Sequence, residues 1–121
     1  MIGPHHSAGY SGGRKSILPG VASFETIRNH HRINPDKIML DKLNNNPFHT
    51  MAMQAAERIG VDFMINVVLN SEKEVVKIVA GHWVDAWNEG VNFCNQISKA
   101  TLPGYSDIVI TSPGGIPGIL I

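Results

Sequence analysis

Apolar residues recur at intervals of three and four in parts of this chain, which is the spacing of one face of an α-helix. Such a stripe predicts a helix near 47–59, with Pro47 in its first turn and Gly60 directly after its last turn. The apolar positions of this stripe are Phe48, Met51, Ala52, Ala55 and Ile59. A second stripe predicts a helix near 84–100. A third helix is expected near 23–32, where a serine stands at the start and an asparagine–proline pair follows the end.

Continuous apolar runs rich in β-branched residues predict strands. The runs at 61–70 and 75–80 are joined by a polar turn, so they predict a β-hairpin or a strand beside an edge strand. The run at 106–112 predicts a third, buried strand that leads into a glycine turn. Helices and strands in this order predict an α/β fold, a fragment of a Rossmann-like domain with a small sheet, in which ligands collect at the carboxyl ends of strands.

The length of 121 residues allows one hydrophobic core. Ten basic residues balance ten acidic ones, so no broad field of one sign favours nucleic acid or an anionic membrane surface. The sequence shows no signal peptide and no apolar run of roughly 20 residues, and its single cysteine, Cys94, cannot form an internal disulfide. These features predict a cytoplasmic protein whose binding depends on a local site.

A glycine-rich stretch, Ala8-Gly-Tyr-Ser-Gly-Gly-Arg-Lys-Ser16, has the general look of a phosphate-binding loop. The Walker pattern needs glycine directly before the lysine, and here that position holds Arg14, whose side chain would obstruct the backbone around a phosphate. The residues instead favour a tight turn at Gly12-Gly13 followed by a short helix near 14–18. They leave open whether Lys15 is a solvated surface lysine or a functional one.

The six histidines are the other residues that could carry chemistry: His5, His6, His30, His31, His49 and His82. Cys94 has no CxxC partner, so a cysteine-rich zinc site is excluded and any metal would depend on imidazole and non-protein ligands. His5 lies in a glycine-flanked loop and is either a general base or a solvated histidine. His31 lies near a helix end and is either a metal ligand or a histidine favoured by the helix dipole. His49 either caps or packs.

The stretch from His5 to Ser23 resembles the nickel-dependent lactate racemase family and its 2-hydroxy-acid racemase and epimerase relatives. Further motifs follow in the family's order and at similar spacing: Asn46-Pro-Phe-His49, Phe63-Met-Ile-Asn-Val-Val-Leu-Asn70, Ala80-Gly-His82 and Asp107-Ile-Val-Ile-Thr-Ser-Pro-Gly-Gly-Ile-Pro117. The resemblance therefore covers nearly the whole chain.

The resemblance implies a role for Lys15. In that family the lysine of the motif is joined through a thioamide to a nickel-pincer nucleotide, a pyridinium mononucleotide whose ring carbon and two sulfurs hold nickel. The histidine ten residues earlier, here His5, is a catalytic acid or base, and the histidine sixteen residues later, here His31, is the remaining nickel ligand. The resemblance thus assigns His5 and Lys15 to catalysis, Lys15 with Ser11, Gly12 and Gly13 to cofactor binding, and His31 to the metal. His30 adjoins His31 and could take the metal in its place.

The reaction implied by the resemblance interconverts the D and L isomers of lactate or another small 2-hydroxy acid, by moving a hydride to the lysine-bound pincer ring and back. The N-terminal part and the C-terminal domain of the family are absent from this sequence. We therefore expect 1–121 to be a single partial domain, the central cofactor-bearing part, with little or no activity alone.

The expected partners are a small 2-hydroxy-acid substrate and either a second copy or a chain that supplies the missing domains, without nucleic acid or membrane. Two alternatives from other functional classes remain. The chain is a truncated, non-catalytic α/β binding or assembly module, or it is a generic phosphate-binding domain that uses the Gly12-Gly13 turn. Mass and metal content distinguish them, because only the racemase-like reading expects an adduct on Lys15 together with nickel.

Overall fold

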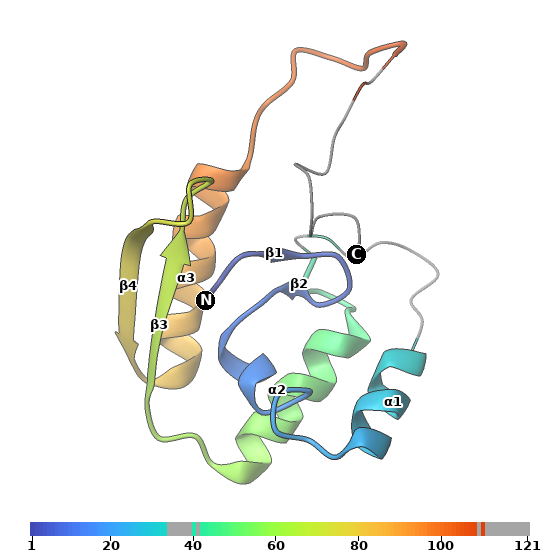
Figure 1. The fold of residues 1–121 in the computed structure, drawn as a ribbon, viewed down its shortest axis with the longest axis vertical. Helices are drawn as coiled ribbons and strands as arrows, with labels where there is room; N and C mark the ends of the chain where they lie inside the picture. The colour runs from blue at the N-terminus through green and yellow to red at the C-terminus, as the bar shows by residue number, and fades with distance from the viewer. Residues whose placement is uncertain (34–39, 41, 109, 111–121) are drawn as a thin grey trace.

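A computed structural model of the chain describes residues 1–33, 40, 42–108 and 110. In chain order its elements are β1 (Pro4–His5), β2 (Gly9–Tyr10), the 3-10 helix η1 (Gly13–Ser16), α1 (Phe24–Arg32), α2 (Pro47–Ile59), β3 (Met64–Leu69), β4 (Val75–Gly81) and α3 (Trp83–Ser98). The described strands form two separate antiparallel pairs, β1 with β2 and β3 with β4 (Figure 1). This arrangement confirms the predicted α/β class, the three long helices and the hairpin near 61–80.

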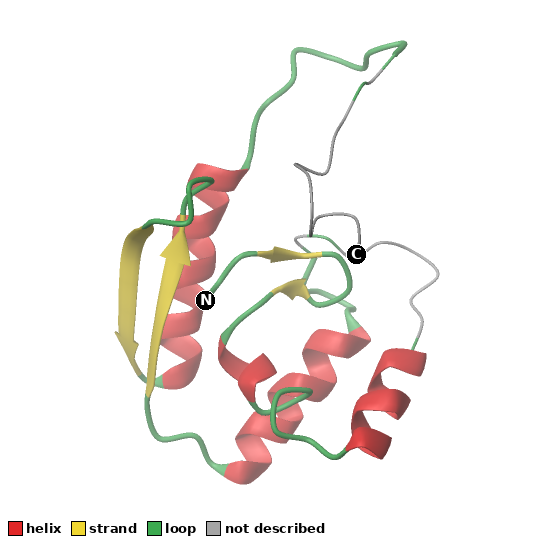
Figure 2. Ribbon diagram, viewed as in Figure 1, coloured by secondary structure: helices red, strands yellow, loops and turns green. Residues whose placement is uncertain are grey.

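The larger layer consists of the β3–β4 hairpin with α3 lying along one of its faces (Figure 2). Alternate strand residues point at the helix, and Met64, Val68 and Val79 are buried there in one apolar cluster with the tryptophans of α3. The start of the chain joins the same layer, because the Ile2 N–H donates to the Val67 carbonyl at 2.7 Å. The first residues are thereby fixed beside β3.

The two shorter helices begin at side-chain caps. The hydroxyl of Ser23 accepts from the Thr26 N–H at the start of α1, as the sequence predicts. The Oδ1 atom of Asn46 accepts from the His49 N–H at the start of α2, and Pro47 occupies the first turn. Gly60 ends α2 in the left-handed conformation, with φ of 79°.

Two predictions are corrected. Residues 106–108 and 110 form no strand, and the other positions of the predicted 106–112 strand lie outside the described residues. An apolar run therefore did not suffice there, since a strand also needs a neighbour to receive its hydrogen bonds. On α2 the buried face is the narrower stripe through Phe48, Ala52 and Ala56, and Met51 is exposed because only that stripe faces the rest of the fold.

The outer face of the β3–β4 hairpin is apolar and uncovered in the described part of the chain. Ile65 is 68% exposed and Ile78 is 64% exposed, and both lie on the face opposite α3. Of the two faces of this hairpin, only the one toward α3 is covered within the described residues. No helix in the described ranges is long and apolar enough to span a membrane.

Candidate functional site

The glycine-rich loop is wrapped around the side chain of Arg14. Arg14 is only 1% exposed, and its guanidinium donates to the Ala8 carbonyl at 2.9 Å and to the Tyr10 carbonyl at 3.2 Å. Gly12 and Gly13 turn the backbone with φ of 76° and 55°, in the left-handed region that a residue with a Cβ rarely adopts. In a phosphate-binding loop, backbone N–H groups face the phosphate and the carbonyls face away from it. Here two carbonyls face the interior of the loop, where they accept from its own arginine.

Trp87 of α3 forms the base on which this loop lies. The guanidinium carbon of Arg14 lies 4.0 Å from the centre of the Trp87 ring, and Trp87 Nε1 donates to the Ser11 carbonyl at 3.0 Å. A Cβ at Gly13 would lie 2.6 Å from Trp87 Cδ1, so the glycine permits this close approach. Burial lowers the pKa of Arg14 to about 10, which leaves the guanidinium charged at neutral pH.

Lys15 follows Arg14 and reaches His5. The Nζ atom of Lys15 lies 2.7 Å from Nε2 of His5, and the other ring nitrogen, Nδ1, accepts from the Ser7 and Ala8 N–H groups at 3.2 Å each. Burial and then the Lys15 charge lower the pKa of His5 to about 4. Burial and then Arg14 lower the pKa of Lys15. Both side chains are therefore biased toward their uncharged forms.

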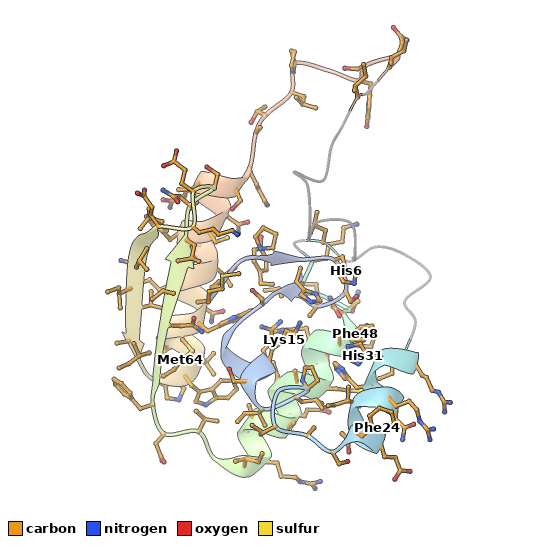
Figure 3. All side chains as sticks on the ribbon, viewed as in Figure 1. His6, Lys15, Phe24, His31, Phe48 and Met64 are labelled. Atoms are coloured by element: carbon orange, nitrogen blue, oxygen red, sulfur yellow. The ribbon has the colours of Figure 1, made fainter. Side chains whose placement is uncertain are left out.

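These two side chains line a small cavity of about 100 Å³, here named the histidine pocket. The larger side chains among its lining residues are His5, His6, Lys15, His30, His31 and Phe48. Figure 3 shows Lys15, His31 and Phe48 gathered between the glycine loop and the facing ends of α1 and α2. The histidine pocket thus brings His5, Lys15 and His31 together, the three residues singled out from the sequence.

His31 presents one free ring nitrogen. Its Nδ1 lies 2.8 Å from the Ile27 carbonyl, and because a carbonyl only accepts, Nδ1 carries the proton. Nε2 then keeps its lone pair, the arrangement in which imidazole binds a metal. Within the described residues no group of three or more His, Cys, Asp or Glu side chains could hold a metal ion. A single imidazole fits a metal that arrives with most of its donors already supplied by a non-protein group.

His30 is the buried member of the adjacent pair. It is 3% exposed, its ring meets the Phe48 ring edge-on at 4.9 Å, and its nitrogens have no hydrogen-bond partner of good geometry among the described residues. Burial lowers the pKa of His30, partly opposed by the Phe48 backbone. His30 therefore packs as a neutral ring at the wall of the histidine pocket, beside the more exposed His31.

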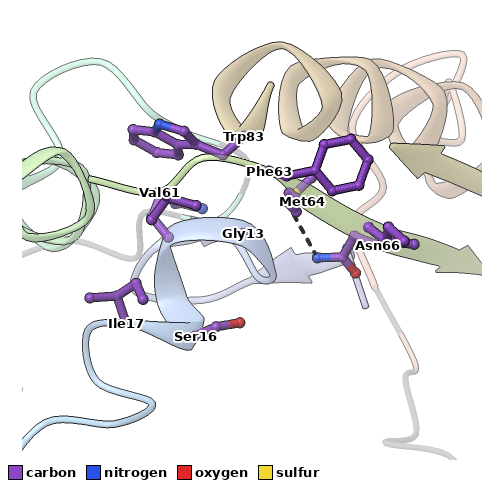
Figure 4. A pocket seen from close by; sticks show the side chains of 10 residues that line it. Gly13, Ser16, Ile17, Val61, Phe63, Met64, Asn66 and Trp83 are labelled. Carbon is purple, nitrogen blue, oxygen red and sulfur yellow. Dashed lines mark hydrogen bonds between the residues drawn. The ribbon is translucent and has the colours of Figure 1, made fainter. Parts of the chain in front are cut away.

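The predicted cofactor-binding glycines lie apart from this pocket. Gly13 lines a larger cavity of about 210 Å³, with Ser16, Val61, Asn66 and Trp83 (Figure 4). The Ser11 hydroxyl donates to the carbonyls of Met1 and Gly3 at 3.2 Å each.

Gly12 packs closely as well, since a Cβ there would lie 2.7 Å from the Met1 carbonyl oxygen. Ser11 and Gly12 therefore attach the loop to the start of the chain, whereas Lys15 projects into the histidine pocket.

Asn46 is a site residue that the sequence pattern did not single out. It is 0% exposed, and its Nδ2 donates to the carbonyls of Ser7 and Lys42 at 2.9 Å each while Oδ1 caps α2. The sequence predicted a helix start at Pro47 but did not assign its cap to Asn46. The bond to Ser7 was not predicted either, since it joins positions 39 residues apart.

His49 belongs to the first turn of α2, and its role was left open by the sequence. Its ring stacks on Trp87 with centroids 5.6 Å apart, on a tryptophan that also contacts Arg14. Burial and then Arg14 lower the pKa of His49 to about 4. His49 is accordingly a packed neutral ring behind the loop, and it does not line the histidine pocket.

The chain is similar in sequence to known lactate racemases. Residues 1–39 match the family of the lactate racemase N-terminal domain. The chain is 41% identical over 120 residues to a lactate racemase of Thermoanaerobacterium thermosaccharolyticum and 38% identical over 121 residues to a lactate racemase of Lactiplantibacillus plantarum. Each alignment covers 97% of this chain and 28% of the relative, so the chain spans little more than a quarter of those proteins.

The fold agrees with the sequence similarity. The solved structure of the lactate racemase apoprotein from Thermoanaerobacterium thermosaccharolyticum matches with a TM-score of 0.73 and 40% identity. The match covers 80% of this chain and 24% of that one. The described elements are therefore those of a known fold.

Proposed function

We propose that this chain, a relative of the lactate racemases in sequence and fold, is the cofactor-tethering part of a 2-hydroxy-acid racemase. Lys15 would hold a nickel-pincer nucleotide covalently, and His31 would bind its nickel. The observation that carries the proposal is the histidine pocket, in which His5, Lys15 and His31 line one small cavity although they come from three different segments, β1, η1 and α1.

The donor set of the histidine pocket fits such a group. His31 offers one imidazole lone pair at Nε2, and imidazole is a suitable ligand for nickel that other donors already surround. Lys15 offers an amine with its positive charge disfavoured by burial. When bound, the pincer group supplies the hydride chemistry, accepting a hydride from the substrate and returning it to either face.

The residues around the histidine pocket hold Lys15 in position and limit the access of water to it. Arg14 fixes the backbone from which Lys15 projects, since its guanidinium joins two carbonyls of the loop. His30 and Phe48 provide a buried apolar wall that reduces the access of water. A small 2-hydroxy acid is the proposed substrate, and a cytoplasmic location is proposed from the single free cysteine.

His5 would exchange a proton with the substrate hydroxyl. Its Nδ1 accepts two backbone N–H groups, so the proton of the neutral ring stands on Nε2, the atom that faces Lys15. In this state Nε2–H can donate a hydrogen bond to the substrate oxygen. To accept the hydroxyl proton, the ring must turn so that its unprotonated nitrogen faces the substrate.

Nickel content and intact mass test the proposal. The chain is produced together with enzymes that make the pincer nucleotide, and the Lys15 peptide is mapped by mass spectrometry. We expect an adduct on Lys15 and close to one nickel per chain, with nickel lost in His31→Ala and retained in His82→Ala, which changes an exposed histidine at the start of α3. A bare Lys15 and a metal-free chain under these conditions would overturn the proposal.

The uncovered face of the β3–β4 hairpin favours a second candidate, a non-catalytic assembly module. Exposed apolar side chains on one sheet face, such as Ile65 and Ile78, are typical of surfaces that another protein covers. This candidate expects association that Ile78→Lys abolishes, together with an unmodified Lys15. Light scattering on the two proteins separates it from the first proposal.

A further inference from the structure

The hydrogen bonds around His5 determine where its proton lies. Backbone N–H groups only donate, so the Ser7 and Ala8 amides that point at Nδ1 require a lone pair on that atom. A protonated imidazolium, which carries hydrogen on both nitrogens, cannot fill this position. His5 is therefore neutral in this arrangement, with its single hydrogen on Nε2.

The same reasoning determines the state of Lys15. Its Nζ lies 2.7 Å from His5 Nε2, which is a hydrogen-bond distance, and Nε2 is the donor. An ammonium group has no lone pair to accept that hydrogen, whereas a free amine has one. The contact is a hydrogen bond only when Lys15 is a free amine.

The surroundings of Lys15 favour the free amine as well. Of the described residues that line the histidine pocket none is acidic, so no carboxylate there stabilises an ammonium ion. Among the described residues, the titratable and charged groups that face the pair are all basic: Arg14 beside it on η1, His6 stacked on His5, and His30 and His31 from α1. Half-burial among such groups disfavours a further positive charge.

We propose that His5 Nε2–H holds Lys15 as a free amine, and that His5 thereby activates Lys15 toward activated acyl and thioacyl donors. The inference rests on the proposed function for the identity of the natural donor. His5 then has a positioning role in the loading of Lys15, separate from proton exchange with a substrate.

The chemical step is balanced within the pair and the donor. The Nζ lone pair forms a bond to the acyl or thioacyl carbon, and the bond from that carbon to the leaving group breaks with its electron pair. The proton lost from Nζ goes to the leaving group or to water, and no oxidant or reductant takes part. In the amide or thioamide product the Nζ lone pair is delocalised, so His5 Nε2–H loses its acceptor and becomes available to another ligand.

Competitive acetylation with a trace of acetic anhydride tests the inference on the chain without nickel or nucleotide. The labelling of Lys15 is followed by mass spectrometry from pH 6 to 10 against Lys73 and Lys77, which belong to the turn and the second strand of the hairpin. We expect Lys15 to label about tenfold faster than Lys73 near pH 8, because a larger share of Lys15 is present as the reactive free amine. Labelling no faster than Lys73 at every pH would overturn the inference.

Two variants of His5 distinguish the hydrogen bond from general packing. His5→Phe removes the donor and is expected to slow the labelling of Lys15 about fivefold or more, whereas His5→Gln keeps an N–H donor and retains part of the rate. His82→Phe, at the exposed start of α3, is the matched control and should leave Lys15 unchanged. The unchanged labelling of Lys77 in each variant reports that the hairpin remains folded. Equal labelling of Lys15 in all variants contradicts the role of His5.

The outcome is independent of the nickel test. Fast labelling of Lys15 that depends on His5, in a chain that never takes up nickel, supports this inference and refutes the proposed function. A chain that takes up nickel when the pincer nucleotide is supplied, but whose Lys15 labels slowly and independently of His5 when the nucleotide is withheld, has the opposite meaning.

Discussion

The central guanidinium carbon of Arg14 lies 4.0 Å from the centre of the Trp87 ring, and this contact joins the glycine loop to α3. Arg14→Met keeps much of the volume but leaves the carbonyls of Ala8 and Tyr10 without their donors. We expect the free energy of unfolding in urea to fall by about 2–4 kcal/mol. Arg28→Met changes an exposed arginine of α1 and should cost within about 0.5 kcal/mol. Equal losses would show that the buried guanidinium contributes nothing specific.

Gly13 tests the close approach of the loop to Trp87. In Gly13→Ala the new Cβ meets the tryptophan ring and the residue keeps a φ of 55°, so both overpacking and backbone strain act. We expect a loss of about 2–5 kcal/mol in chemical unfolding. Gly60→Ala is the matched control, because φ is 79° there but no atom lies within 4 Å of the new Cβ. Its strain alone should cost about 1–2 kcal/mol. A control as costly as Gly13→Ala would remove packing from the explanation.

Stability should fall as the solution is acidified from pH 7. His5 and His49 have pKa values near 4 in the folded chain, against 6.5 for an ordinary histidine. The unfolded chain therefore binds more protons between these values, and the stability is full above about pH 6.5 and is lost progressively as pH falls through 4. Since both rings are only half-buried, each should contribute less than the roughly 1.4 kcal/mol per pH unit of a fully protected group.

Urea unfolding at several pH values measures this dependence. His49→Gln should give a shallower decline than the unaltered chain, whatever its effect on the absolute stability, because one of the histidines with a lowered pKa is gone. The same steepness in His49→Gln as in the unaltered chain would assign the pH dependence to other groups.

Asn46 is expected to control the position of the His5 loop. Asn46→Asp keeps the oxygen that caps α2 but replaces the amide that donates to the carbonyls of Ser7 and Lys42. We expect a loss of about 1–3 kcal/mol in unfolding free energy and slower acetylation of Lys15, because the loop that carries His5 loosens. Asn44→Asp, at an exposed neighbouring position, should change neither measurement. If the two variants behave alike, the amide bonds do not hold the loop.

The helices and the hairpin could be predicted because their causes are local. The spacing of apolar residues, the caps at Ser23 and Asn46 and the glycine at position 60 all act within a few residues. The predicted strand near 106–112 failed at 106–108 and 110 for the opposite reason, since a strand is completed by a partner from elsewhere in the chain.

The candidate site was likewise predicted only in part from the sequence. The motif resemblance selected His5, Lys15 and His31, and these three line one cavity. From the sequence, Arg14 was interpreted only as a residue that would obstruct phosphate binding. Its structural role was not predicted, because its partners include Trp87, which lies 73 positions later on another element. Contacts of that range are set by the fold and are not visible in local periodicity.

The arginine enclosed by the glycine loop also limits how far the motif can be transplanted. A peptide that carries only Ala8 to Ser16 would retain Arg14 and the carbonyls that surround it, but it would lose Trp87 and the N-terminal residues to which Ser11 is bonded. Such a peptide would not hold Lys15 in place, and it would also lack His5. As a labelling tag for protein engineering, the lysine would have to be grafted with its whole supporting domain.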